Sequence, residues 1–164
     1  MGNKTRLLFV CLGNIVRSPL AEKLFAHLAE RDGTGHRYEV DSAGIGGWHV
    51  GEHPDARMRQ VAAGRGFSYN GRARQFTPKD FDRFDWIIVM DASNRMSLNS
   101  QARNDADRNR IRMLRAFDPH GTADEEVPDP YYGGIDGFER VYDVVERSCA
   151  GLLEALEGGS LSQT

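Results

Sequence analysis

Four segments rich in apolar residues predict the strands of this protein. Residues 5–11 (TRLLFVC) and 85–91 (DWIIVMD) contain unbroken apolar runs, the pattern of strands buried on both faces of a parallel sheet. Residues 38–42 predict a shorter strand, and residues 111–114 a fourth with a weaker pattern. The order of these segments along the chain leaves room for a helix after each strand.

Segments with apolar residues at helical spacing lie between and after the strands. One begins at Ser18-Pro19, which predict an N-cap followed by a proline in the first turn. Further helices are expected over residues 54–65, 92–104 and 135–156. Because strands alternate with helices, the pattern predicts an α/β fold whose parallel sheet is covered on both faces.

Length and composition indicate one globular unit. The chain has 164 residues, within the range of about 100–200 that is usual for one domain. Its 40% of hydrophobic and 27% of charged residues are typical of a folded chain. We expect a single domain over residues 1–157 and a flexible C-terminal tail over residues 158–164.

Several partners and locations are disfavoured by the sequence. No apolar run approaches the roughly 20 residues of a membrane-spanning helix, and the 21 basic residues form no dense block, so neither a membrane nor nucleic acid is expected as a partner. Residues 1–6 match neither a secretion signal nor a myristoylation site, which predicts the cytoplasm. Cys11 and Cys149 are too few for a disulfide scaffold.

The loop after the first strand has the residues of an anion site. Ligands of open parallel sheets bind at the carboxyl ends of strands, and here that end is followed by Cys11–Ser18 (CLGNIVRS). Backbone amides of such a loop can form a concave nest, and the following helix N-terminus adds about half a positive charge. The planar guanidinium of Arg17 can hold two phosphoryl oxygens at once. The loop therefore predicts a phosphate site.

The same surroundings favour Cys11 as a nucleophile. A helix N-terminus and a neighbouring arginine stabilise a thiolate near neutral pH, and the Ser18 hydroxyl would donate a hydrogen bond to it. Gly13 and Asn14 are residue types that accept a left-handed backbone. A cysteine that ends a buried strand is usually an inert small hydrophobe, but the strand, the five-residue loop, the arginine and the helix start together point to catalysis.

Longer motifs resemble those of the low-molecular-weight protein tyrosine phosphatases. The resemblance rests on CLGNIVRSP at 11–19, DSAG at 41–44, MDASN at 90–94 and DPYY at 129–132, and it extends over residues 5 to about 155. A bare C-x5-R motif occurs in unrelated phosphatases, whereas the extended loop with a late Asp-Pro is much more specific. The resemblance implies a flavodoxin-like three-layer sandwich with a four-stranded parallel sheet in the order 2-1-3-4.

The resemblance also implies a protein tyrosine phosphatase that needs neither metal nor cofactor. Cys11 would form a phosphocysteine, Arg17 and the loop amides would bind phosphate, and Asp129 would act as general acid and base. From its sequence context alone, Asp129 is an ordinary turn residue. The implied substrate-binding set is Leu12, Gly13, Asn14, Ile15, Val16, Ser18, Trp48, Tyr131 and Tyr132, and the supporting set is Ser42, Asp91 and Asn94.

The individual matches differ in what they imply. The three aromatic residues would sandwich a phenyl ring at the pocket mouth, although Trp48 could instead belong to the core. Ile15 favours phosphotyrosine, because relatives that act on phosphoarginine tend to have a threonine there. Asp91 and Asn94 would line the back of the site, or simply cap the next helix.

Two positions depart from the family pattern. Val16 occupies the place of a cysteine that can protect the nucleophile as a disulfide, and Cys149 is expected in the core. Gly71 stands near the place of a histidine that braces the loop asparagine, so we expect Ser18 and Ser42 to hold Asn14 instead.

The cysteine and histidine content of the sequence disfavours several other functions. An arsenate reductase would need more cysteines, and a phosphate-binding module would have no use for both Cys11 and Asp129. His49 and His53 have neither a helical frame nor a carboxylate partner, so no metal site is expected. Expected partners are phosphotyrosine-containing proteins, including a cognate tyrosine kinase, with the enzyme a monomer or a weak dimer.

Overall fold

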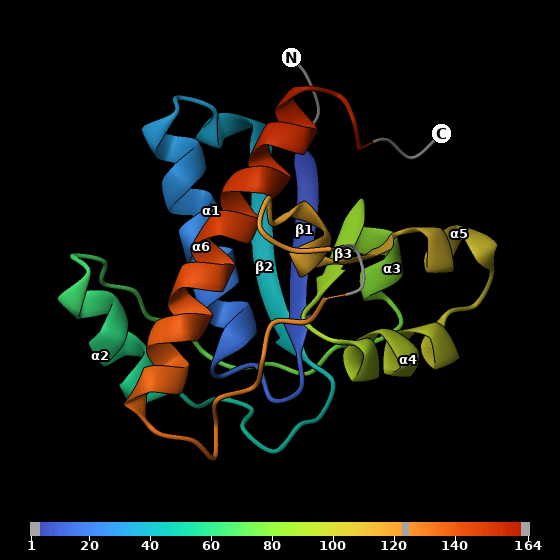
Figure 1. Cartoon of the computed structure of the whole chain (residues 1–164). Coiled ribbons are helices and arrows are strands. Elements are labelled where there is room, and N and C mark those ends of the chain that lie inside the picture. Colours follow the sequence, from blue (N-terminus) through green and yellow to red (C-terminus); the bar gives the residue numbers. More distant parts are fainter. Residues whose placement is uncertain (1–3, 123–124, 162–164) are drawn as a thin grey trace.

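The sheet contains four parallel strands in the order β2-β1-β3-β4. The computed structural model describes residues 4–122 and 125–161 (Figure 1). The strands are β1 (Thr5–Cys11), β2 (Tyr38–Gly44), β3 (Trp86–Val89) and β4 (Ile111–Met113). The expected α/β class and strand order are therefore confirmed.

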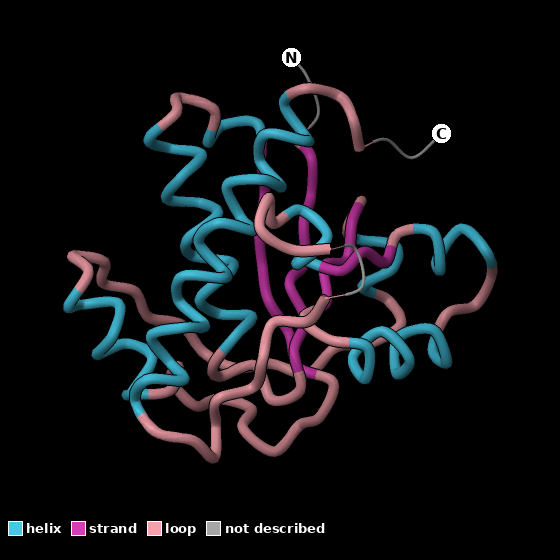
Figure 2. Tube along the Cα trace, viewed as in Figure 1, coloured by secondary structure: helices cyan, strands magenta, loops and turns pink. Residues whose placement is uncertain are grey.

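Strand β1 lies at the centre of the fold and separates two hydrophobic cores. Leu7 and Phe9 face one core, whereas Leu8 and Val10 face the other, and all four are fully buried. This alternation follows from the two-residue period of a strand, and it explains why the segment is apolar throughout. Both neighbours of β1 run parallel to it, so their carboxyl ends meet at one edge of the sheet. Figure 2 shows loops gathered beyond one end of the strands.

Helices cover both faces of the sheet (Figure 1). Helices α1 (Arg17–Arg31), α2 (Ala56–Gly64) and α6 (Ile135–Glu157) contribute to the first core. Helices α3 (Asp80–Arg83) and α4 (Ala92–Gln101) contribute to the second. The short α5 (Asp105–Asn109) leads into β4, and two 3-10 helices cover Gly35–Arg37 and Leu114–Phe117.

Three local predictions require correction. Helix α1 begins at Arg17 rather than after a Ser18 cap, and the side chain of Ser18 is buried. Helices α3 and α5 were not predicted, because both are about one turn long and lack an apolar period. Helix α2 is shorter than expected, since the Asp55 carboxylate caps it by accepting from two backbone amides.

The C-terminal segment continues past α6. The Ser160 amide donates to the Ala155 carbonyl oxygen, and Leu161 packs against the first core. Residues 162–164 of the expected tail lie outside the described residues. The division into a domain and a tail stays a prediction. Within residues 4–122 and 125–161, none of the helices has the length and apolar character needed to cross a membrane.

Cys149 lies in the first core, as expected. Its Sγ atom lies 3.6 Å from the carbonyl oxygen of Ala21 in α1, and the residue is fully buried. Burial raises the pKa of the thiol well above its ordinary value. Cys149 is therefore a protonated packing residue at neutral pH, and both described cysteines are free thiols.

A buried carboxylate joins the chain after β4 to α6. Asp118 accepts hydrogen bonds from the Arg115 and Arg147 guanidinium groups and from the His120 amide, at 2.7 to 3.2 Å. Burial by itself would raise the pKa of Asp118, but hydrogen bonds from Arg147, the His120 amide and Arg115 lower it to about 2. The ionised form is therefore favoured in the folded state.

We expect Asp118→Asn to destabilise the fold by about 2 kcal/mol near neutral pH. Since the folded-state pKa lies below the unfolded value, this stabilisation is present above about pH 4 and disappears as the pH falls toward 2. Urea unfolding at pH 7 and pH 3 measures both differences. Asp105→Asn is the matched control, because Asp105 is 93% exposed and its ion pair with Arg108 contributes little. An equal loss in the two variants would contradict the assignment.

Candidate active site

The loop between β1 and α1 forms the floor of the site. Cys11 is the last residue of β1, and Arg17 is the first residue of α1. Asn14 adopts the left-handed backbone, with φ of 58°, as expected, whereas Gly13 does not. Gly13 is instead required by space, because an added Cβ atom would lie 2.9 Å from Cδ2 of His49. Asn14 thus supplies the left-handed turn of the loop, and Gly13 leaves room for the His49 ring.

The thiol of Cys11 meets a hydroxyl inside the loop. Cys11 is buried, and its Sγ atom lies 3.0 Å from Oγ of Ser18. Asn14 donates from Nδ2 to the same Oγ at 2.8 Å. Because this oxygen accepts from Asn14, its own hydrogen can point at the sulfur, with the Ala43 carbonyl oxygen as a longer alternative at 3.4 Å. The Ser18 hydroxyl is therefore placed to donate a hydrogen bond to the Cys11 sulfur.

The side chain of Asn14 is held by Ser18 and by a backbone amide. Its Oδ1 accepts from the Arg74 amide at 2.9 Å, in the segment that bridges to Gly44. The expected contact with Ser42 is wrong, because the Ser42 hydroxyl donates to a carboxylate oxygen of Glu22 at 2.6 Å. Ser42 therefore ties β2 to α1 and acts on the loop indirectly.

Arg17 is a buried cation at the base of the site. Only 2% of the residue is exposed, and Nη1 donates to Asp91 at 2.8 Å and to the Val127 carbonyl oxygen at 2.9 Å. Nη2 lies 3.6 Å from an Asp129 oxygen. Burial by itself lowers the pKa of Arg17, but the negative charges of Cys11, Asp91 and Asp129 raise it above the ordinary value. The guanidinium is fixed and charged, as oxyanion binding requires.

The end of β3 supplies the support for this cation. Asp91 caps α4 by accepting from the Asn94 amide at 2.7 Å, and its other oxygen binds Arg17. Asn94 is buried and accepts from the Met90 amide at 3.3 Å. The expected helix cap at Asp91 is confirmed, and the same carboxylate also orients Arg17. Asn94 shapes the backbone beneath that carboxylate.

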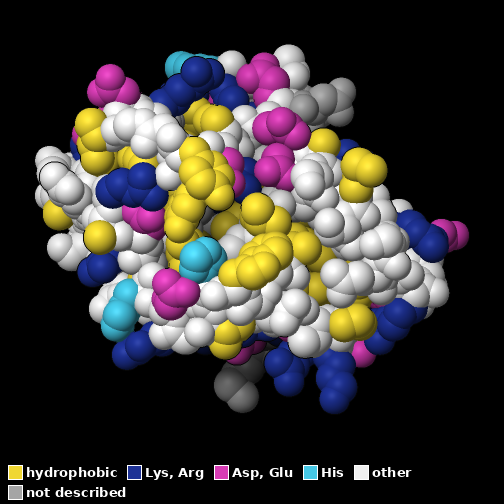
Figure 3. Space-filling view, turned by 90° about the horizontal axis from the view of Figure 1, so that it is seen from below, with side chains coloured by type: hydrophobic (Ala, Val, Ile, Leu, Met, Phe, Trp, Pro, Cys, Tyr) yellow, Lys and Arg dark blue, Asp and Glu magenta, His cyan; other side chains and the backbone are white. Residues whose placement is uncertain are grey.

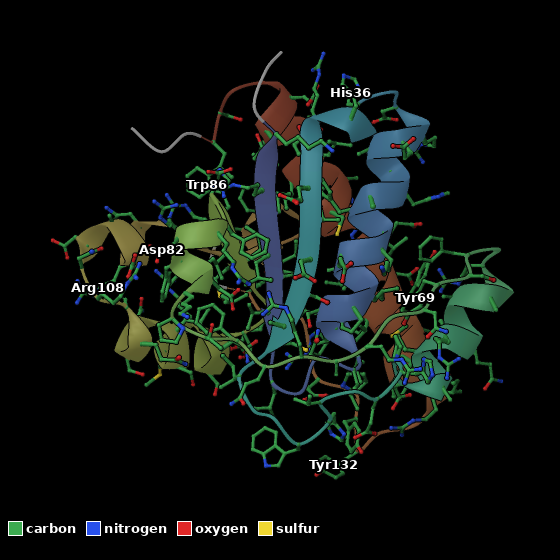
Figure 4. The ribbon with its side chains drawn as sticks, turned by 180° about the vertical axis from the view of Figure 1, so that it is seen from behind. His36, Tyr69, Asp82, Trp86, Arg108 and Tyr132 are labelled. Carbon is green, nitrogen blue, oxygen red and sulfur yellow. The ribbon has the colours of Figure 1, made fainter. Side chains whose placement is uncertain are left out.

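A cavity of about 450 Å³ opens above the loop. Figure 3 looks onto this end of the molecule and shows hydrophobic side chains gathered around its centre. Tyr132 is 98% exposed and projects beyond the strand ends (Figure 4). Trp48 is 70% exposed, which rules out a place in the core. The lining residues are Cys11, Leu12, Gly13, Ile15, Val16, Arg17, Trp48, His49, Asp129, Tyr131 and Tyr132.

His49 is a lining residue that the sequence analysis missed. Its Nδ1 lies 2.8 Å from a Glu52 oxygen, so the expected absence of a carboxylate partner is wrong. Its ring centroid lies 6.2 Å from that of Tyr131. No group of three or more His, Cys, Asp or Glu residues is arranged to hold a metal ion in the part of the chain that the structure describes. The Trp48-His49 pair in a glycine-rich loop was the available signal.

We expect Gly44→Ala to lower the activity that the resemblance implies, measured as kcat/KM for an aryl phosphate, by about tenfold to a hundredfold. An added Cβ atom would lie 2.9 Å from the Gly13 carbonyl carbon and 3.0 Å from the Asn14 nitrogen, so the loop must shift. Gly64→Ala is the control, because a Cβ atom there has no neighbour within 4 Å among the described residues. Steady-state kinetics of both variants measure the change in kcat/KM. Wild-type activity in Gly44→Ala would show that the loop tolerates the shift.

Comparisons with known proteins agree with this geometry. The family model for low molecular weight phosphotyrosine protein phosphatase matches residues 6–160, nearly the whole chain. The chain belongs to this family, and it is an enzyme of the protein tyrosine phosphatase class.

Individual relatives and solved structures match over most of the chain. A low molecular weight protein-tyrosine-phosphatase of Streptomyces coelicolor is 45% identical over 152 residues, 92% of this chain and 93% of the relative. A crystal structure of a protein tyrosine phosphatase from Entamoeba histolytica superimposes with a TM-score of 0.91 at 39% identity, covering 96% of this chain and 100% of the other. A Drosophila arginine phosphatase also matches, with a TM-score of 0.84 at 34% identity over 92% of this chain and 97% of its own.

Proposed function

We propose that this enzyme hydrolyses phosphotyrosine in proteins, and small aryl phosphates, through a phosphocysteine intermediate on Cys11. The observation that carries the proposal is the meeting of three groups at one cavity. Cys11 is the last residue of β1, and its side chain lines the cavity together with Arg17 and Asp129. An Asp129 oxygen lies 3.6 Å from the Arg17 guanidinium. A nucleophile, a phosphate-binding cation and a proton donor are the minimum set for metal-independent transfer of a phosphoryl group.

In the first step, the Cys11 thiolate attacks phosphorus in line with the leaving oxygen. The S–P bond forms as the bond from phosphorus to the phenolic oxygen breaks, and the Asp129 carboxyl group gives its proton to that oxygen. Arg17 and the loop amides hold the equatorial oxygens. Since these donors are oriented before the substrate arrives, they stabilise the charge of the transition state without reorganisation.

In the second step, water attacks the phosphocysteine. The Asp129 carboxylate takes a proton from the water, the O–P bond forms, and the S–P bond breaks to release inorganic phosphate. The electron pair returns to Cys11 as a thiolate. The Ser18 hydroxyl, 3.0 Å from the sulfur, stabilises that thiolate and so assists its departure.

The pocket walls favour an aromatic substrate. Trp48, Tyr131 and Tyr132 stand at the mouth of the cavity, where a phenyl ring would pack between them. Ile15 is buried and presents an apolar side chain to the same cavity. An apolar wall suits a phenyl ring, whereas the guanidinium part of phosphoarginine would leave its hydrogen-bond donors unpaired there.

We expect Ile15→Thr to lower kcat/KM for a phosphotyrosine peptide about tenfold or less and to lower the preference for phosphotyrosine over phosphoarginine. Hydrolysis of paired peptides in EDTA by the parent and the variant measures both ratios. Leu12→Thr is the matched control at the exposed rim, where the same change should alter the preference less. A parent enzyme that prefers phosphoarginine would contradict the proposed substrate.

A redox role is not supported by the cysteines. Val16 stands beside Arg17 in the loop, and Cys149 is buried against α1 without an exposed sulfur. An arsenate reductase relay would need an accessible partner thiol for Cys11.

We also propose the wider setting that this activity implies. The substrates are phosphotyrosine-containing proteins, among them a cognate tyrosine kinase, and the enzyme works in the cytoplasm as a monomer or weak dimer. A single catalytic domain over residues 1–157 would suffice for the reaction. Sedimentation over a range of concentrations would test the oligomeric state, and a stable higher oligomer would contradict it.

A further inference from the structure

Arg57, in the first turn of α2, lies against the aromatic wall of the pocket without lining the cavity itself. Its guanidinium carbon is 5.3 Å from the ring centroid of Tyr131 and 4.5 Å from that of Phe138. Phe138 belongs to α6 and is fully buried, whereas Tyr131 lines the cavity. A guanidinium at these distances from two rings makes cation–π contacts with both. Arg57 therefore connects the pocket wall to the core.

The guanidinium of Arg57 is itself held in one orientation. The Asp55 carboxylate accepts from Nε at 3.3 Å and from Nη2 at 3.0 Å, a bidentate pair. The Asp55 amide in turn donates to the Ile15 carbonyl oxygen of the phosphate loop at 2.7 Å. A continuous series of contacts thus runs from the phosphate loop through Asp55 and Arg57 to Tyr131.

Tyr131, which Arg57 contacts, is more buried and better held than its neighbour Tyr132. Tyr131 is half-buried and packs against the first core, whereas Tyr132 is almost fully exposed. The Tyr131 amide also donates to an Asp129 oxygen at 3.1 Å. Tyr131 is therefore a fixed part of the pocket, and no described contact holds the Tyr132 ring except that with Tyr131 itself.

We infer that Arg57 is a positioning residue that sets the affinity for the aromatic part of the substrate by holding the Tyr131 ring in place as the pocket wall. This inference rests on the proposed function, because it concerns the aryl group of the same substrate. The phosphoryl group is bound by Arg17 and the loop, so Arg57 should affect the ring of a ligand and leave the binding of its anionic group unchanged.

A second arginine provides a matched control. Arg65, just past the end of α2, lies 4.9 Å from the Tyr142 ring centroid of α6 and pairs with Glu139 and Asp143 at 2.7 and 2.6 Å. Like Arg57, it places a paired guanidinium against an aromatic ring of α6, although its acidic partners also lie on α6. Neither Arg65 nor Tyr142 lines the cavity. If Arg57 served only to attach α2 to α6, both arginines would act alike.

The test is calorimetric binding of phenylphosphonate and methylphosphonate, which share the anionic group and differ in the ring. In Arg57→Ala, we expect the Kd of phenylphosphonate to rise about threefold to tenfold, the range of a cation–π contact, and that of methylphosphonate to change less than about twofold. Arg57→Lys should resemble Arg57→Ala, because lysine lacks the planar fork. Arg65→Ala should change neither Kd.

A double-variant cycle shows whether Arg57 acts through Tyr131. In a Tyr131→Ala background, Arg57→Ala should have no further effect on the Kd of phenylphosphonate. Equal effects of Arg57→Ala on both ligands, an equal effect of Arg65→Ala, or additive effects in the double variant would overturn the inference. A parent protein that binds neither phosphonate would instead refute the phosphate site and the proposed function with it.

Discussion

Cys11→Ser is expected to lower the kcat for phosphotyrosine peptides by about 10⁴-fold or more, the scale on which loss of a nucleophile acts. A serine hydroxyl remains protonated near neutral pH and is a much weaker nucleophile than a cysteine sulfur. Steady-state release of inorganic phosphate measures the loss. Binding of phosphate should persist in the variant, because Arg17 and the loop amides are unchanged.

Cys149→Ala is the matched control for this experiment. Cys149 is the second described cysteine, and its buried thiol packs against α1. The variant should lose some stability and retain the activity of the parent, since Cys149 lies outside the cavity. If Cys11→Ser kept most of the parental kcat, or if Cys149→Ala lost it, Cys11 would not be the nucleophile.

Asp129→Asn is expected to lower kcat by about 10²- to 10⁴-fold, the usual contribution of general acid–base catalysis. An asparagine cannot give a proton to the leaving phenolate. The loss should therefore be largest for phenols that leave poorly and smallest for nitrophenols, which leave as stable anions. A series of substituted phenyl phosphates, measured with the parent and the variant, gives this dependence.

A carboxylate seven residues further along the chain serves as the control for Asp129. Asp136→Asn removes an exposed charge from the first turn of α6 and should leave kcat nearly unchanged. A loss in Asp129→Asn that does not vary with the leaving group would contradict a role as general acid. Such a result would instead assign Asp129 to orienting Arg17, with which it pairs at 3.6 Å.

The loop from Cys11 to Ser18 could be predicted because its chemistry is local in sequence. The buried strand, the left-handed position at Asn14 and the arginine at the helix start all lie within eight residues. Asp91 follows a strand at the same edge of the sheet, but its place in the site was implied by the resemblance. Asp129 follows no strand, and only the resemblance pointed to it.

Other features depend on contacts between distant segments. The partner of Asn14 is the Arg74 amide, 60 residues away, in a segment without a periodic pattern. Ser18 has the sequence of a helix cap, but tertiary contacts with Cys11 and Asn14 determine its position. His49 and Arg57 were missed for the same reason, because their roles depend on Tyr131, which belongs to a loop much later in the chain.

The most direct test of the mechanism is to quench turnover of a phosphotyrosine peptide in acid and to locate phosphoryl groups on the enzyme by mass spectrometry. We predict one phosphoryl group on Cys11 in the parent enzyme, and none in Cys11→Ser. Turnover by the parent with no phosphoryl group on Cys11, or with one on another residue, would contradict the phosphocysteine mechanism.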